Sequence, residues 1–172
     1  MGLQKQAKIL SKHQQITMLR FLDTTRYPER NKVIFLLSIK AGLRAKEIAH
    51  ITWSMVTDSN GQIADKIHLE DSASKGRSGG VIWMNNELQD ALSIYFQSYH
   101  NAPSANDRII KTERRQSTSS QNIINIFRMW YLKLGFDGCS SHSGRRTFIT
   151  NSARKISTVA GSIKDVQMLA RH

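Results

Sequence analysis

Apolar residues recur every three or four positions along most of this chain, and every second position in one short region. The first spacing places apolar side chains on one face of an α-helix, whereas the second places them on one face of a β-strand. The pattern therefore predicts a mainly helical protein. Helices are expected over residues 14–24, 29–41, 43–53, 86–96, 120–134, 147–155 and 162–169.

The segment 29–41 would be apolar on most sides of its helix, which is typical of a helix buried at the centre of a domain. Gly42 follows it and can end it in the left-handed conformation that glycine adopts easily. Ser119 or Ser120 can cap the helix that stops at Gly135, and Ser162 can cap the last helix.

Strand signals are confined to residues 53–85. Polar and apolar residues alternate over 66–71, a second strand is expected at 81–84, and Asn60-Gly61 is a dipeptide typical of hairpin turns. The polar, glycine-rich stretch 72–80 predicts a basic hairpin tip. The predicted fold class is mainly α with a small antiparallel β-sheet (α+β) of about three strands.

The chain of 172 residues is long enough for one domain with a substantial core and short for two. Its 25 Lys and Arg against 13 Asp and Glu give a formal net charge of +12, and residues 111–172 hold 11 basic and 3 acidic residues, an excess of 8. Such a field attracts polyanions, of which nucleic acid is the commonest. Ribosomal and membrane-surface proteins share this balance, so the charge predicts a class of partner and no activity.

Targeting signals are missing from the sequence as given. Residues 1–20 lack the apolar core of a signal peptide, and the longest strongly apolar run, Val33–Leu37, is far too short to span a bilayer. Cys139 is the single cysteine, which excludes an internal disulfide and suits a reducing compartment. We therefore expect a cytoplasmic protein without a membrane partner.

The stretch S-S-H-S-G-R-R-T-F-I-T, residues 140–150, places His142, Arg145 and Arg146 at the start of a predicted helix. Three cations beside a helix N-terminus oppose the helix dipole, so local stability does not favour them there. An anion that must be held would explain them, and a solvated basic turn is the alternative. His142 and Arg145 lie one helical turn apart and therefore share a face.

Three other residues occupy special positions. Arg44 starts a helix directly after a Gly-Leu break, Lys75 stands on the hairpin tip, and His172 ends the chain after an apolar helix. Each also has a simple structural explanation. Arg44 could pair with Glu47 on the surface, Lys75 could keep a hairpin soluble, and His172 could be a frayed end.

Taken together, four motifs in this order resemble the catalytic domain of tyrosine recombinases, the phage-integrase family. They are G-L-R-A-K-E-I (42–48), S-K-G-R (74–77), H-S-G-R-R-T-F (142–148) and D-V-Q-M-L-A-R-H (165–172). The resemblance extends from about residue 11 to 172. It implies two phosphate-clamping arginines, a general acid on the hairpin and two auxiliary histidines: Arg44 and Arg145, Lys75, and His142 and His172. We expect Arg44, His142 and Arg145 to meet in one basic pocket.

The implied reaction breaks and rejoins DNA strands through a tyrosine, in site-specific recombination or integration. Guanidinium forks offer fixed paired donors to the non-bridging oxygens and stabilise the charge that develops in the transition state. A lysine on a hairpin tip can protonate the departing 5′ oxygen. The resemblance implies no metal and no cofactor. It implies double-stranded DNA as the partner, self-association on that DNA, and a bacterial or phage-derived protein.

The sequence departs from the family pattern at several points. Gly144 stands where the family usually has leucine, Arg171 stands where it usually has glycine, and the interval from Arg145 to His172 is a few residues longer than usual. The family's nucleophilic tyrosine lies within three helical turns beyond the last histidine, where this sequence has already ended. The chain contains four tyrosines, all at positions that packing explains: Tyr27, Tyr95, Tyr99 and Tyr131.

The expected unit is therefore a single recombinase-type catalytic domain over residues 1–172, truncated at its C-terminus and without the helical core-binding domain that precedes it in longer members. Two alternatives remain: a non-cleaving DNA-binding module or regulator derived from a recombinase, and a helix-turn-helix regulator. A-G-L-R-A-K-E-I-A-H-I (41–51) suggests the last of these. It leaves Lys75 and the cluster after His142 without a role.

Overall fold

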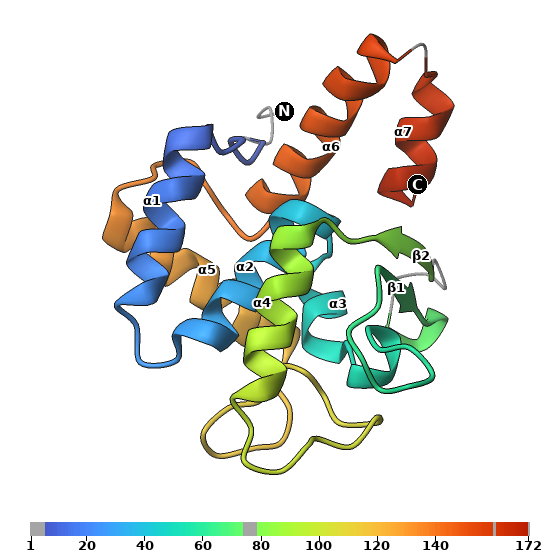
Figure 1. Ribbon diagram of the computed structural model, residues 1–172. Helices are drawn as coiled ribbons and strands as arrows, with labels where there is room; N and C mark the ends of the chain where they lie inside the picture. The colour runs from blue at the N-terminus through green and yellow to red at the C-terminus, as the bar shows by residue number, and fades with distance from the viewer. Residues whose placement is uncertain (1–5, 74–78, 160, 172) are drawn as a thin grey trace.

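The computed structural model describes residues 6–73, 79–159 and 161–171. These residues form seven α-helices and a two-stranded antiparallel sheet (Figure 1). The helices are α1 (Lys12–Asp23), α2 (Pro28–Ala41), α3 (Ala45–His50), α4 (Asn86–Gln97), α5 (Ser120–Leu134), α6 (Ser143–Thr158) and α7 (Ile163–Ala170), and the strands are β1 (Lys66–Leu69) and β2 (Gly80–Trp83). The predicted fold class is confirmed.

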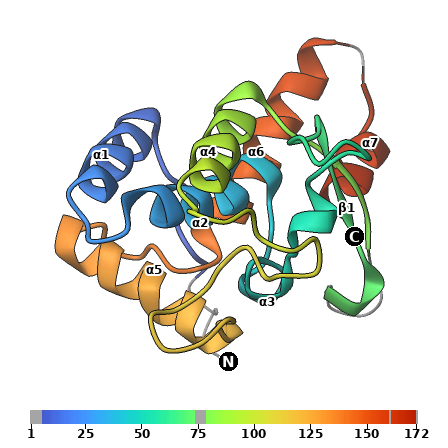
Figure 2. The same cartoon turned by 60° about the horizontal axis from the view of Figure 1, so that its bottom comes forward.

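Helix α2 lies at the centre of the domain, as its apolar pattern predicts. It packs against α1, α3, α4 and α6, and the side chains from Val33 to Leu37 are all buried (Figures 1 and 2). Gly42 ends α2 in the left-handed conformation, with φ of 65°. The elements that carry the candidate site residues are therefore built around one buried helix.

Local capping chemistry sets several helix ends where the sequence predicts them. The Ser119 hydroxyl accepts the backbone N–H of Asn122 at 3.1 Å, and Gly135 ends α5 with φ of 66°. Ser162 precedes α7, where its backbone N–H donates to Asp165 at 2.7 Å. Each of these bonds satisfies backbone groups that a helix terminus leaves without a partner.

The sheet within the described residues has two strands and not about three. β1 and β2 pair in the register Lys66↔Trp83 to Leu69↔Gly80. The stretch expected to supply a further strand forms a 3₁₀ turn, Trp53–Met55, and then an isolated bridge between Thr57 and Ile63. The Asp58 side chain accepts the backbone N–H groups of residues 60 and 62, which closes a tight turn in place of a strand.

Gly144 has a packing reason in this fold. A Cβ at this position would lie 2.9 Å from the Cβ of Ser38 and nearer still to the Ser38 hydroxyl. Ser38 is fully buried on α2, so the first turn of α6 approaches α2 at this point more closely than a side chain would allow. The departure from the family's leucine is thus matched by a serine on the facing helix.

This contact yields a test of the packing. Replacing Gly144 with leucine is expected to lower the free energy of unfolding by about 1–3 kcal/mol or more, because the added side chain enters a filled interface. Urea unfolding followed by circular dichroism measures the loss. Gly61, beside which a Cβ would meet nothing within 4 Å, provides a glycine control. Because the φ of Gly61 is 75°, a conformation that most side chains disfavour, the control variant is Gly61→Asn. Asparagine tolerates that conformation better than most residues.

Helix α6 also anchors the N-terminal segment. Arg146 Nη1 donates to the backbone carbonyl of Ala7 at 2.6 Å, and the hydroxyl of Thr147 accepts the N–H of Leu10 at 2.8 Å. The N–H of Lys8 donates to the carbonyl of Gly138 at 3.0 Å, just before α6. The first two of these long-range bonds tie the start of α6 to residues 7–10, and the third ties the loop before α6 to the same segment.

Candidate functional site

Gly42 joins two parts of the chain that carry predicted site residues. Its backbone carbonyl accepts a hydrogen bond from Arg145 Nη1 at 2.6 Å, across 103 positions of sequence. A Cβ on Gly42 would lie only 2.5 Å from a ring carbon of Phe148, one turn further along α6. Only glycine combines the positive φ with this close approach. The loop that begins α3 is therefore held directly against the start of α6.

Glu47 is the carboxylate around which the site is built. Its side chain is 0% exposed, and it accepts three hydrogen bonds. Two come from Arg44, whose backbone N–H reaches Oε2 at 2.7 Å and whose Nη1 reaches Oε1 at 3.0 Å. The third comes from Arg171 Nη2, which reaches Oε2 at 2.9 Å. The expected ion pair between Arg44 and Glu47 thus exists. It is not a surface pair, however, because the Glu47 carboxylate is fully buried.

Arg145 completes a group of three guanidinium groups, which we call the arginine cluster: Arg44, Arg145 and Arg171. Arg145 is 7% exposed. Burial, together with the nearby charges of Arg44 and Arg171, lowers the pKa of Arg145 to about 10, and Glu47 acts in the opposite direction. Among the described residues, these three cations share one buried carboxylate, so positive charge is in excess within this group. Such a site favours an anion.

The structure brings together two of the five predicted site residues. Arg44 and Arg145 both belong to the arginine cluster. His142 is exposed at the N-cap of α6, and among the described residues no side-chain hydrogen bond or ion pair links it to the cluster. Lys75 and His172 lie outside the described residues, as does the predicted mobility of the hairpin tip. The catalytic roles of all five remain predictions.

Sequence reasoning missed Arg171 as a member of the cluster. It noted this residue only as a departure from the family's glycine. The available signal was Arg171 itself, a basic residue directly before His172 at a position where glycine would be best suited to end the helix. Arg146 lies next to Arg145 in the sequence motif but does not belong to the arginine cluster. Its side chain donates to the carbonyl of Ala7.

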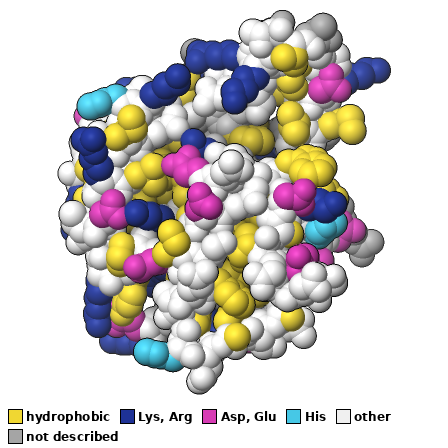
Figure 3. All heavy atoms as spheres, viewed as in Figure 1, with side chains coloured by type: hydrophobic (Ala, Val, Ile, Leu, Met, Phe, Trp, Pro, Cys, Tyr) yellow, Lys and Arg dark blue, Asp and Glu magenta, His cyan; other side chains and the backbone are white. Residues whose placement is uncertain are grey.

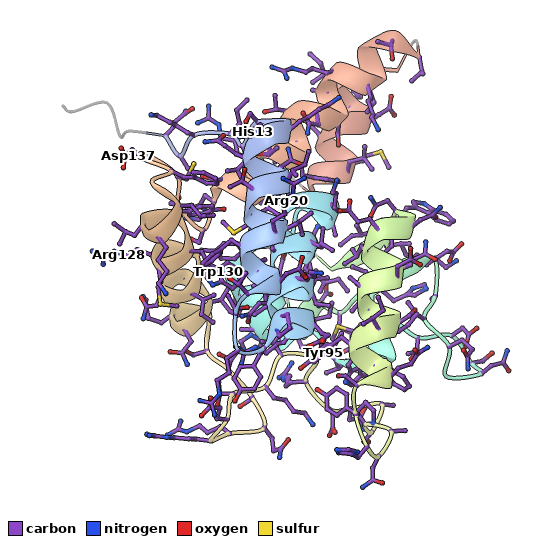
Figure 4. All side chains as sticks on the ribbon, turned by 60° about the vertical axis from the view of Figure 1, so that its left-hand side comes forward. His13, Arg20, Tyr95, Arg128, Trp130 and Asp137 are labelled. Atoms are coloured by element: carbon purple, nitrogen blue, oxygen red, sulfur yellow. The ribbon has the colours of Figure 1, made fainter. Side chains whose placement is uncertain are left out.

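The tyrosines lie in packed or hydrogen-bonded settings. Tyr95 donates to the carbonyl of Ile109 at 3.2 Å and accepts from Tyr99, while Tyr131 is 2% exposed. Burial raises the pKa of both Tyr95 and Tyr131. Figure 4 shows Tyr95 near the lower end of α4. A hollow of about 260 Å³ beside Tyr27, Tyr95 and Tyr99 includes no member of the arginine cluster.

The outer surface carries further positive charge near the cluster's helices. Figure 3 shows Lys and Arg side chains along the upper edge of the molecule over α6, where Arg154 and Lys155 are exposed. No helix in the part of the chain that the structure describes is both long enough and apolar enough to cross a membrane.

Solved structures with the same fold are recombinases and integrases. The XerA recombinase matches with a TM-score of 0.71 and 20% identity, over 96% of this chain and 56% of that one. The Tn1549 transposon integrase in complex with a circular intermediate DNA matches with a TM-score of 0.70 and 17% identity, over 99% and 59%. A lambda integrase dimer bound to a COC′ core site matches with a TM-score of 0.69 and 18% identity, over 96% and 45%. The chain thus spans about half to three-fifths of these proteins.

No curated protein matches the chain significantly in sequence. The model of the phage integrase family, in contrast, matches residues 8–172, which is nearly the whole chain. The match includes α1 to α7 and all members of the arginine cluster. This chain belongs to the phage integrase family.

Proposed function

We propose that this chain provides the phosphate-binding core of a site-specific DNA recombinase that cleaves and rejoins DNA strands. The observation that carries the proposal is the arginine cluster, in which Arg44 and Arg145 from distant parts of the sequence are held at Gly42 and Glu47. Two guanidinium groups in this arrangement can grip the non-bridging oxygens of one phosphate. The positive charge of buried Arg145 and half-buried Arg44 would be neutralised by the phosphate in the complex.

The remaining roles follow from the family membership and are part of the proposal. Lys75 would protonate the departing 5′ oxygen, and His142 and His172 would orient the phosphate and handle the proton of the nucleophile. In the transition state the arginines stabilise charge that is absent from the ground state, so they contribute to rate more than to affinity. The proposed partner is double-stranded DNA, on which the protein would self-associate.

A second candidate function is DNA occupancy without cleavage. For residues 1–172 taken alone it is favoured by the positions of the four tyrosines, whose hydroxyl groups are buried by packing or engaged in hydrogen bonds such as that from Tyr27 to Glu113 at 2.6 Å. Both functions predict the same phosphate contact and the same affinity for duplex DNA. They differ only in whether a covalent protein–DNA bond forms.

DNA binding tests the shared part of the proposal. The logarithm of the affinity for a random-sequence duplex should fall with the logarithm of salt concentration, with a slope of about −0.9 per phosphate neutralised. Arg145→Gln should weaken binding modestly and reduce the magnitude of the slope by about 0.9, because one phosphate contact among several is lost. Fluorescence anisotropy over a range of KCl concentrations measures both quantities.

Arg128→Gln is the matched control, since Arg128 is exposed on α5 and points away from the body of the protein in Figure 4. It removes the same formal charge without touching the arginine cluster. Equal slopes for the wild type and Arg145→Gln would mean that Arg145 does not contact DNA phosphate, and would remove the basis of the proposed function.

A further inference from the structure

The backbone of Arg171 adopts a conformation that side chains disfavour. Its φ of 52° and ψ of 56° place it in the left-handed region, and it is the one non-glycine residue with positive φ in the part of the chain that the structure describes. The Cβ of an L-residue crowds its own backbone in that region, which glycine avoids. A strained residue of this kind points to a constraint beyond ending a helix.

The Arg171 side chain has more donors than acceptors. It is 7% exposed, so water does not hydrate it, and its Nη2 donates to Glu47 at 2.9 Å. Nε and Nη1 are buried and have no hydrogen-bond partner in the described structure. Buried N–H groups without an acceptor are rare in folded proteins, because the loss of hydration is not recovered. These two nitrogens therefore have hydrogen-bonding capacity that no described residue uses.

The surroundings of Arg171 identify that acceptor as an anion. Arg171 shares the Glu47 carboxylate with Arg44, and its charge acts on buried Arg145. Helix α7 returns beside α6 toward the sheet (Figures 1 and 2), and a Cβ on Gly80 at the start of β2 would lie 3.9 Å from Cδ of Arg171. Arg171 thus lies between Glu47 and the start of β2. A neutral acceptor would satisfy the N–H groups but would leave the excess charge in place.

We propose that Arg171 is a third anion-binding residue of this site and donates to a phosphate oxygen through an N–H group that has no acceptor among the described residues. The inference rests on the proposed function, because it assigns the same phosphate to the arginine cluster. It adds that the cluster binds phosphate with three guanidinium groups. Glu47 then has two tasks, since Oε1 accepts from the Arg44 guanidinium and Oε2 accepts from the Arg171 guanidinium as well as from the Arg44 backbone N–H.

The experiment uses the 172-residue protein with inorganic phosphate as the probe, at constant ionic strength, by isothermal titration calorimetry. Arg171→Gly suits the left-handed backbone and should keep the fold, while it should lower phosphate affinity by roughly tenfold or more, as expected for loss of a charged hydrogen bond. Arg171→Lys retains the charge without the planar fork, so its affinity should lie between those of the wild type and Arg171→Gly. Arg128→Gly, on exposed α5, should bind phosphate like the wild type once its own folding is verified.

Arg145→Gln separates this inference from the proposed function. If Arg145→Gln loses phosphate affinity while Arg171→Gly retains it, the cluster binds phosphate without Arg171 and only this inference is overturned. If the wild type binds no phosphate, or Arg145→Gln binds it as the wild type does, the proposed function fails as well. If Arg171→Gly and Arg171→Lys lose affinity equally and both melt at lower temperature without phosphate, Arg171 supports the fold and the inference is overturned.

Discussion

Replacing Glu47 with glutamine is expected to destabilise the protein by about 3–5 kcal/mol, the usual cost of removing one partner from a buried ion pair. The substitution preserves the size of the side chain but leaves Arg44 and Arg171 without their shared carboxylate. The two guanidinium groups then repel each other and Arg145 in a site that water enters poorly. Urea unfolding monitored by tryptophan fluorescence measures the change from the transition midpoint and slope.

Glu113→Gln is the matched control for this measurement. Glu113 also pairs with an arginine, Arg26, at 2.7 Å, but both side chains are largely exposed, at 47% and 76%. An exposed pair contributes about 0–1 kcal/mol, so the control should unfold almost like the wild type. Similar losses for the two variants would contradict the conclusion that Glu47 neutralises a buried cluster.

Residues 1–172 are expected to bind DNA in cells without forming a covalent bond to it. Arginines stabilise the transition state but cannot attack phosphorus, so a covalent intermediate requires a tyrosine hydroxyl within reach. Tyr95 and Tyr99 bond to each other, and the hydroxyl of Tyr131 is buried. DNA recovered from expressing cells under denaturing conditions, and probed for attached protein, should therefore carry none. A recombinase that contains its own nucleophilic tyrosine provides the positive control.

A covalent adduct would make one of the four tyrosines the nucleophile. Substituting each in turn with phenylalanine would then identify it, and Arg145→Gln should abolish the adduct if the arginine cluster activates the phosphate. Such a result would overturn the assignment of the C-terminal motif at residues 165–172, and it would favour the enzyme over the non-cleaving binding module.

The helices could be predicted from sequence because their ends depend on neighbours within a few positions. Gly42 and Gly135 adopt the left-handed conformation that ends a helix, and Ser119 and Ser162 precede the helices that they were expected to cap. The central position of α2 also followed from sequence, since its apolar residues cover most of its surface. The further strand that the sequence predicted does not form, also for a local reason. The Asp58 side chain accepts the backbone N–H groups of residues 60 and 62, which a strand would have used for pairing.

The site could be predicted only in part, because its key contacts join residues far apart in sequence. Arg44 and Arg145 were expected to lie close together, and the structure places them so. Arg145 donates to the carbonyl of Gly42, two residues before Arg44, and the charges of Arg44 and Glu47 both act on it. The burial of Glu47 was not foreseen, since Arg171, which completes its set of partners, lies 124 positions away. Spacing along one helix predicts neither of these contacts.

Consecutive side chains of α6 hold different parts of the protein. Arg145 donates to the carbonyl of Gly42, whereas Arg146 donates to the carbonyl of Ala7. A helix is rigid over one residue, so any rotation or shift of α6 that repositions Arg145 around a bound anion also moves the attachment point of residues 7–10. If anion binding shifts α6 in this way, protection of the Leu10 amide, which donates to Thr147 on the same helix, will change, and hydrogen exchange with and without phosphate measures that change.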